Sequence, residues 1–293
     1  MLKVLAPKSG EIYLDATFGG GGYSQAILDA EEDCTVFAVD RDPAAIQRAE
    51  VFKTKYAHRF HFFSGCFSSL EEVLPSASFF NGIVADFGVS SFQLEEPERG
   101  FSFRFEGPLD MRMSQTGLTA AEVINTFNVD NLAKIFWTYG EESKAYKVAQ
   151  AIVNQRRNKL FKTTSELADL IRQIVKRKDG LDPATLCFQG LRIFINNELI
   201  EIDKFLLKCN RILLDEGKII TVAFHSLEDR IVKNWFNANR FSDPSSSKAV
   251  FEVESLLKKP IMPTLKEVRE NPRSRSAKLR AFILRYLPQV KGL

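Results

Sequence analysis

The stretch Glu11-Ile-Tyr-Leu-Asp15-Ala-Thr-Phe-Gly-Gly-Gly-Gly22 decides the fold of this chain. Its apolar first part predicts a β-strand that ends at Asp15, and the four glycines predict a tight loop before a helix. Glycine has no Cβ and tolerates positive φ, so the backbone of such a loop can come within hydrogen-bonding distance of a ligand. The stretch therefore predicts a strand–loop–helix unit that holds a ligand.

A second predicted strand, 35–39, ends in Asp40, which lies 18 residues past Gly22. A carboxylate at this distance from a glycine loop is placed to accept the two hydroxyls of a ribose. Together the two features predict a nucleoside-containing cofactor at the carboxyl edge of a sheet. A dinucleotide fingerprint would need glycine or alanine where Ser24 stands. This weakens the case for a nicotinamide cofactor without excluding one.

The order of the predicted elements indicates an α/β fold with an inserted helical domain. Strand and helix signals alternate over the first ~95 residues, as in a mostly parallel sheet covered on both faces. Helical patterns follow, with capping boxes at Thr119–Glu122 and Thr163–Glu166 and a helix that begins at Pro183 and continues past residue 200. The strand pattern then returns and closes with a strand over Lys278–Tyr286. We expect a discontinuous sheet domain, 1–103 and 197–293, and a helical, substrate-recognising domain, 104–196.

Composition excludes several classes of protein. The 293 residues carry a net charge of +3 and are 45% hydrophobic, which is enough for a sizeable core. No stretch approaches the ~18 apolar residues of a membrane span, and the first residues lack the apolar region of a signal peptide. The four cysteines form no C-x-x-C pair. We therefore expect reduced thiols, no metal site and a cytoplasmic location.

Two runs of positive charge contain no acid. Asn154–Lys162 and Arg273–Arg280 each carry four cations, those of the second run being Arg273, Arg275, Lys278 and Arg280. A single run of this kind is typical of a solvated face. Beside a domain that binds a nucleoside cofactor, the two runs together make a polyanionic partner about as plausible as a solvated surface.

Two polar residues follow other predicted strands. Asp86 ends the strand Ile83–Asp86 and begins a turn of small residues, where cofactor and substrate would meet; alternatively it caps the next helix. His225 follows a strand over Lys218–Phe224 and is either a catalytic residue or a structural hydrogen-bonding residue. The sequence Asp86-Phe-Gly88 matches the magnesium motif of kinases, but no H-R-D or V-A-I-K motif accompanies it, so a kinase is excluded.

Ten motifs occur in an order that resembles the RsmH/MraW family of bacterial methyltransferases, and the match covers nearly the full length. The motifs are Asp15-Ala-Thr-Phe-Gly-Gly-Gly-Gly, Val39-Asp-Arg-Asp-Pro43, Asp86-Phe-Gly-Val-Ser-Ser, Arg99-Gly-Phe-Ser-Phe, Gly107-Pro-Leu-Asp-Met-Arg-Met113, Tyr139-Gly-Glu-Glu142, Pro183-Ala-Thr, Phe188-Gln-Gly-Leu-Arg192, Phe224-His-Ser-Leu-Glu-Asp-Arg230 and Asn271-Pro-Arg-Ser-Arg-Ser-Ala277. The resemblance implies a class I S-adenosylmethionine-dependent methyltransferase fold, Rossmann-like with an inserted all-helical domain. It also implies methylation of the exocyclic N4 of a cytidine in the decoding region of 16S ribosomal RNA, with the RNA or the small ribosomal subunit as partner.

The resemblance also implies site residues. Carried over position by position, the family's contacts with S-adenosylmethionine fall on Gly21, Gly22, Tyr23, Asp40, Phe67, Asp86 and Gln93. The family usually has histidine at Tyr23 and proline at Phe92, so a contact through the ring and the rigidity of the turn before Gln93 are expected to differ. It normally has an upstream His-x-Pro-Val segment, which this chain starts too late to contain; either the start is misassigned or part of the rim of the site differs. With RNA as partner, Arg273, Arg275 and Lys278 are expected RNA contacts, and we expect a monomer or a weak homodimer.

The chemistry fits these residues. Methyl transfer to an exocyclic amine needs no covalent intermediate, but a group must accept the amine proton and hold the nitrogen in line with the methyl group. Asp86 is the first candidate for this acceptor and His225 the second. Methylation at cytosine C5 would need a thiolate nucleophile, and no cysteine lies on either of these turns, so we expect N-methylation.

Three alternatives remain open. A nicotinamide-dependent oxidoreductase would respond to NAD(H) and not to S-adenosylmethionine. A non-catalytic assembly factor would bind ribosomal particles without transferring a methyl group. A DNA amino-methyltransferase would carry an S/N/D-P-P-Y/F turn after the strand, where this chain has Asp86-Phe-Gly-Val.

Overall fold

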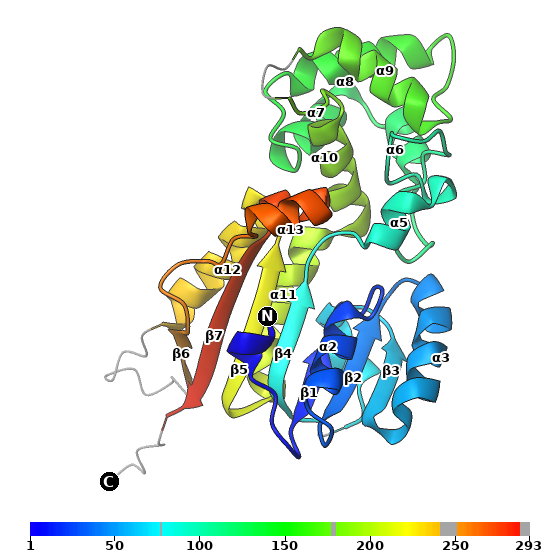
Figure 1. Ribbon diagram of the computed structural model, residues 1–293. Coiled ribbons are helices and arrows are strands. Elements are labelled where there is room, and N and C mark those ends of the chain that lie inside the picture. The colour runs from blue at the N-terminus through cyan, green and yellow to red at the C-terminus, as the bar shows by residue number, and fades with distance from the viewer. Residues whose placement is uncertain (77, 177–179, 241–250, 288–293) are drawn as a thin grey trace. The chain divides into compact units, whose positions relative to one another are not determined.

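The protein consists of two compact units in a computed structural model that describes residues 1–76, 78–176, 180–240 and 251–287. One unit is formed by Met1–Gly88 with Leu199–Leu293 and the other by Val89–Glu198 (Figure 1). The helical unit therefore begins before the expected residue 104. The reason is packing: Val89, Leu94 and Phe101 belong to or pack against the hydrophobic core of the helices.

The first unit is built on a seven-stranded sheet with the order β3-β2-β1-β4-β5-β7-β6. Its strands are β1 (Ile12–Asp15), β2 (Thr35–Asp40), β3 (Phe60–Ser64), β4 (Phe80–Asp86), β5 (Leu213–Ala223), β6 (Phe251–Ser255) and β7 (Lys278–Tyr286). The first five pair in parallel, and β7 runs antiparallel to both β5 and β6. This confirms the predicted mostly parallel, Rossmann-like sheet and its closing strand, whereas the edge strand β6 was not expected.

Helices cover both faces of the sheet, as Figure 1 shows. The helices of this unit are α1 (Leu2–Leu5), α2 (Gly22–Ala30), α3 (Ala44–Tyr56), α4 (Leu70–Val73), α11 (Glu198–Ile212), α12 (Ser226–Asn239) and α13 (Leu265–Glu270), with 3-10 turns η1 (Ala57–Arg59), η2 (Phe67–Ser69) and η4 (Pro272–Ser276). Adjacent residues of a strand point to opposite faces, so Val84 packs with α1, α2 and α3 while Ile83 packs with α4, α11 and α12. Burial on both faces explains the near-continuous apolar strands in the sequence.

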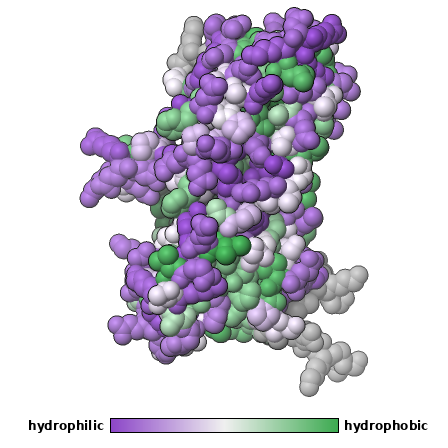
Figure 2. Space-filling view, turned by 90° about the vertical axis from the view of Figure 1, so that its right-hand side faces the viewer, coloured by the Kyte–Doolittle hydropathy of each residue, from purple (hydrophilic) through white to green (hydrophobic). Residues whose placement is uncertain are grey.

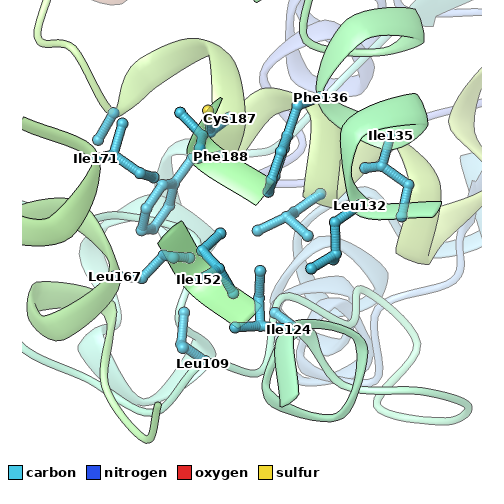
Figure 3. Packing of buried hydrophobic residues seen from close by; sticks show 14 of the residues in the cluster. Leu109, Ile124, Leu132, Ile135, Phe136, Ile152, Leu167, Ile171, Cys187 and Phe188 are labelled. Carbon is cyan, nitrogen blue, oxygen red and sulfur yellow. The ribbon is translucent and has the colours of Figure 1, made fainter. Parts of the chain in front are cut away.

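The second unit is helical. It contains α5 (Ser91–Glu95), α6 (Ala120–Thr126), α7 (Val129–Thr138), α8 (Ala145–Arg156), α9 (Thr164–Ile174), α10 (Thr185–Asn196) and the 3-10 turn η3 (Pro97–Arg99). The capping boxes at Thr119 and Thr163 are confirmed, since each hydroxyl accepts from a backbone N–H three residues on and each glutamate reaches back. In Figure 3, side chains from several helices converge on one apolar core, among them Phe136, Ile152 and Phe188.

One long predicted helix is two helices. The stripe that begins near Pro183 continues past residue 200 in the sequence, but Asn197 adopts a left-handed conformation (φ 51°) between α10 and α11. The apolar spacing runs through this break because both helices bury apolar residues, so periodicity alone does not detect it. The polar composition of Asn237–Lys248 also predicts a loop there, but α12 extends to Asn239, and residues 241–250 lie outside the described part of the chain.

The surface is mostly hydrophilic in the view of Figure 2, interrupted by small hydrophobic areas. Large apolar side chains are exposed in both units, and Trp137 of α7 is among the most exposed of them at 64%. No helix among the described residues is long and apolar enough to cross a membrane.

Candidate active site

Four neighbouring parallel strands bring polar residues to one edge of the sheet. The strand order reverses between β1 and β4, since the chain runs outward from β1 to β2 and β3 on one side and from β4 to β5 on the other. Asp40, Asp15 and Asp86 end β2, β1 and β4, and His225 lies two residues past the end of β5. Ligands of open α/β sheets bind outside the carboxyl ends of the strands at such a switch point.

Asp15 is fully buried and tied to the first turn of α2. One oxygen accepts from the backbone N–H of Ser24 at 3.1 Å and from its hydroxyl at 2.6 Å, and the other accepts from the backbone N–H of Thr17 at 3.2 Å. Burial raises the pKa of Asp15 to about 6, despite these hydrogen bonds. The carboxyl group therefore fixes the glycine loop between β1 and α2 and sits, partly protonated near pH 6, behind the edge of the sheet.

Asp86 is the least satisfied carboxyl group of the edge. Its backbone N–H donates to the hydroxyl of Thr17 at 2.7 Å, but its buried Oδ1 receives no hydrogen bond from any described residue. Burial, followed by the charges of Asp15 and Glu228, raises the pKa of Asp86 to about 8. Asp86 does not cap the next helix, because the N-cap of α5 is Ser90. The capping alternative is therefore excluded, and the carboxyl group is left facing other acids.

Glu228 is the acid that sequence reasoning missed. It is fully buried in the first turn of α12, where its Oε2 accepts from the backbone N–H of Phe224 at 2.7 Å. His225 is the N-cap of this helix: its Nδ1 accepts from the backbone N–H of Glu228 at 3.4 Å, and its Nε2 lies 3.2 Å from Oε1 of Glu228. His225 therefore has a structural hydrogen-bonding role, and it lies next to Glu228, whose charge acts on Asp86.

The glycine loop is anchored to Asp40. One oxygen of this carboxylate accepts from the N–H of Gly19 at 2.6 Å and the other from the N–H of Asp42 at 2.8 Å. Burial raises the pKa of Asp40, against the effect of these hydrogen bonds. Since a carboxylate oxygen has capacity for more than one donor, ribose hydroxyls remain acceptable partners for Asp40.

The two glycines predicted to contact the cofactor have different environments. Gly21 has φ +80°, and a Cβ there would lie 2.3 Å from the ring of Phe52, so glycine is required for the fold of the loop itself. A Cβ on Gly22 would meet nothing within 4 Å. Gly22 is thus the glycine that leaves backbone open at the start of α2. Next to it, burial and the charges of Asp86, Asp15 and Glu267 raise the pKa of the Tyr23 phenol, so this ring lies beside the acids.

The remaining predicted cofactor residues lie in different units. Phe67 is half-buried in η2 of the sheet unit, with its ring 5.4 Å from that of Phe205 and 6.1 Å from that of Phe87. Gln93 belongs to the helical unit and is 5% exposed. Its side chain accepts from the backbone N–H of Ser90 and completes the capping box of α5, which gives it a structural function in its own unit.

The predicted RNA-contacting cations are not equivalent. Arg273 and Arg275 lie exposed on η4, between α13 and β7. Lys278 begins β7, and its ammonium lies 3.7 Å from the buried carboxylate of Asp229. Arg280 donates to the same carboxylate at 2.6 Å. Lys278 is therefore partly committed to holding α12 against β7, whereas Arg275 extends into solvent.

The edge of the sheet offers a fit for an organic cation. The carboxyl groups of Asp15, Asp86 and Glu228 influence one another, and no described lysine or arginine forms an ion pair with Asp15 or Asp86. A bound sulfonium or ammonium group would place an opposite charge beside Asp86 and stabilise its ionised form. No group of three or more His, Cys, Asp or Glu within the described ranges is arranged to hold a metal ion.

The chain matches known proteins over its whole length. The family described as MraW methylase family matches residues 1–284. The protein named Ribosomal RNA small subunit methyltransferase H of Rickettsia bellii is 47% identical, over 96% of this chain and 95% of its own length. Proteins of the same name from Granulibacter bethesdensis and Gluconobacter oxydans are 45% and 43% identical, over 96% and 99% of this chain and 88% and 92% of their own lengths. Among solved structures, an rRNA methylase from Streptococcus thermophilus overlaps with a TM-score of 0.43 at 8% identity, over 96% of this chain and 92% of that one.

The raised pKa of Asp86 predicts a pH-dependent cost in stability. With a pKa of about 8 in the folded state and about 4 in the unfolded chain, the folded protein binds more protons between these values. The stability of the protein therefore falls as pH rises through this window and levels off above it. Asp86→Asn removes this ionisation. We therefore expect the free energy of unfolding of the variant, relative to that of the wild type, to increase by about 1–3 kcal/mol between pH 5 and pH 8, after allowance for partial solvent exposure.

Urea denaturation of both proteins at the two pH values measures this difference. Asp33→Asn is the matched control, since it removes an exposed carboxylate that precedes β2 at the opposite end of the sheet. A difference in free energy of unfolding between Asp86→Asn and the wild type that does not change with pH would show that the pKa of Asp86 is not raised in the folded protein.

Proposed function

This chain belongs to the MraW methylase family, and from that premise we propose that it transfers a methyl group from S-adenosylmethionine to the exocyclic N4 of one cytidine in the decoding region of 16S ribosomal RNA. The family and the relatives make the protein an S-adenosylmethionine-dependent methyltransferase of small-subunit rRNA. The observation that carries the proposal is the buried, unbonded Oδ1 of Asp86 in a cluster of acids at the switch point.

The acids are suited to hold the cofactor. When bound, S-adenosylmethionine supplies an electrophilic methyl group on a positively charged sulfur. Asp40 and the backbone at Gly22 would hold the nucleoside end, as their positions at the end of β2 and the start of α2 favour. Asp86 would face the cationic end, with Tyr23 and Phe67 of the same unit as aromatic walls.

Asp86 is also our first candidate for the group that accepts the amine proton. A sulfonium bound beside Asp86 would favour its ionised form, which is the form that can accept a proton. His225 is the second candidate, since no described residue hydrogen-bonds its buried Nε2, which lies 3.2 Å from Glu228. Holding the target nitrogen in line and accepting its proton are the two tasks that these residues would perform.

The cysteines favour N-methylation over C5-methylation. Attack on cytosine C6, which C5 chemistry requires, needs a thiolate with a lowered pKa. Burial raises the pKa of Cys34, Cys66 and Cys209, and the carboxylate of Glu201, which accepts from the Cys66 thiol at 2.9 Å, raises that of Cys66 further. None of these three thiols is an activated nucleophile, and the fourth, Cys187, is fully buried in the core of the helical unit. The exocyclic amine is therefore the supported acceptor.

The partners follow from the proposed reaction. The substrate would be 16S rRNA, free or in the small ribosomal subunit, and the reaction would take place in the cytoplasm, where ribosomes assemble. We propose that the helical unit recognises this RNA. A monomer or weak homodimer stays a prediction of the sequence.

Mass mapping of the RNA tests the proposed reaction. Purified protein is incubated with S-adenosylmethionine carrying a labelled methyl group and with 16S RNA or isolated small subunits. We expect one labelled cytidine, released on digestion as N4-methylcytidine. Asp86→Asn should lower the single-turnover rate by at least about 10²-fold, the usual contribution of an acid–base group, while Asp33→Asn leaves it unchanged.

Each other outcome has a defined meaning for this proposal. Label on C5, on a ribose or on another base would refute N4 transfer. Particle binding without label would favour a non-catalytic assembly factor. A variant at Asp86 with near wild-type turnover would remove this residue from the chemistry.

We further propose that Arg273 and Arg275 bind RNA phosphates. Neutralising both (Arg273→Gln with Arg275→Gln) should weaken RNA binding and reduce the slope of log K against log salt by about 1–2, because fewer counterions are released. Filter binding at several salt concentrations measures this slope. The double variant Lys53→Gln with Lys55→Gln removes the same charge from α3 and serves as control. Equal salt slopes for the wild type and the Arg273→Gln with Arg275→Gln variant would show that these arginines lie on a solvated surface and do not bind RNA.

A further inference from the structure

An aromatic pair lies exposed on the helical unit. Trp137 of α7 is 64% exposed and Tyr146 of α8 is 59% exposed. Both line one shallow hollow, together with Ala133, Lys134, Ser143 and Ala145. Neither ring contributes to the core: α7 turns Leu132, Ile135 and Phe136 inward in Figure 3, and α8 buries Val148 and Ile152. Fold stability therefore gives no reason for a tryptophan and a tyrosine at this surface.

The helix that carries Tyr146 is rich in cations, whereas Glu141 and Glu142 directly precede Ser143 at the hollow. Residues 143–165, which include all of α8, contain six cations and no acid: Lys144, Lys147, Arg156, Arg157, Lys159 and Lys162. Lys134 lines the hollow and Lys147 follows Tyr146, both exposed. Neither forms an ion pair with another residue in the described ranges. Lys159, by contrast, is paired with Glu166 at 2.5 Å.

We propose that Trp137 and Tyr146 form a stacking platform for unpaired bases of the RNA substrate, with Lys134 and Lys147 binding the flanking phosphates. Exposed aromatic rings next to unpaired lysines are the combination that single-stranded nucleic acid requires, since bases stack on the rings and cations neutralise the backbone. Lysine is depleted at protein–protein interfaces, so the lysines beside these rings favour an RNA partner over a protein partner. This inference rests on the proposed function, in that it takes RNA as the substrate.

Intrinsic fluorescence tests the platform without any measurement of activity. The chain has two tryptophans, and the other, Trp235, is 6% exposed and packs against Phe282 in the sheet unit. In a Trp235→Phe protein the emission comes from Trp137 alone. Titration with an oligocytidylate of about 12 nucleotides, long enough to cover one single-strand site, should quench this emission in a saturable manner. A duplex RNA of the same length should quench it much less.

Fluorescence anisotropy with a labelled form of the same oligonucleotide measures how much each side chain contributes to binding in the otherwise wild-type protein. We expect Trp137→Ala and Tyr146→Ala each to raise Kd about 5- to 100-fold, as for the loss of one base stack. Lys134→Gln with Lys147→Gln should reduce the salt slope by about 1.4, which is 0.7 per phosphate contact on a single strand. Phe79→Ala is the control, because it removes a 48% exposed aromatic ring at the opposite end of β4 from Asp86.

The outcomes separate the platform from the reaction. Saturable quenching that depends on Tyr146 supports the platform, whether or not the preparation transfers a methyl group to rRNA. A lack of methyl transfer would contradict the proposed function and not the platform. Absence of quenching, an unchanged Kd in both aromatic variants, or an equal loss in Phe79→Ala would overturn the platform. Methylation of small subunits at the wild-type rate by Trp137→Ala with Tyr146→Ala would overturn it as well, while leaving the proposed reaction intact.

Discussion

The burial of one acid near two others is the constraint on which the proposed site depends. Asp86 ends β4, and the charges of Asp15 at the end of β1 and Glu228 in α12 add to the cost that burial imposes on its ionised form. Two of them are stabilised by the fold, Asp15 through Ser24 and Thr17 and Glu228 through the backbone after β5. The buried Oδ1 of Asp86 receives no such hydrogen bond from the described residues, and we propose that the cation of the cofactor stabilises its ionised form. Such strained groups typically mark functional sites, since folding alone would select against them.

The sheet makes this cluster possible because it imposes the geometry before any ligand binds. Parallel pairing places the ends of β2, β1 and β4 at one edge, and the reversal of strand order opens that edge at the switch point. The glycine loop is held by the same acids: Asp40 accepts from Gly19, and Asp15 accepts from Ser24. The carboxylates that we propose for binding also fix the conformation of the loop, so we expect a change in either of them to affect both.

Much of this arrangement was predictable from the sequence, and the exceptions have physical reasons. The strand ends at Asp15, Asp40 and Asp86 follow from short apolar runs, and the capping boxes at Thr119 and Thr163 follow from local spacing. Glu228 was missed because its burial depends on tertiary packing of α12, although the spacing from the N-cap His225 to Glu228 is a capping-box spacing. The break at Asn197 was missed because a single left-handed residue leaves apolar periodicity intact. The exposed pair Trp137 and Tyr146 could not be found either, since only the fold reveals which face of a helix is left uncovered.

The most direct test of the central claim is the proton balance of cofactor binding. Isothermal titration of the protein with S-adenosylmethionine at pH 7, in buffers of different ionisation enthalpy, counts the protons released. With a pKa of about 8 before binding, Asp86 is largely protonated at this pH, and a cation placed beside it should displace most of one proton. We expect this release in the wild-type protein and its loss in Asp86→Asn. Binding with no proton release by the wild type, or with equal release by both proteins, would contradict the account.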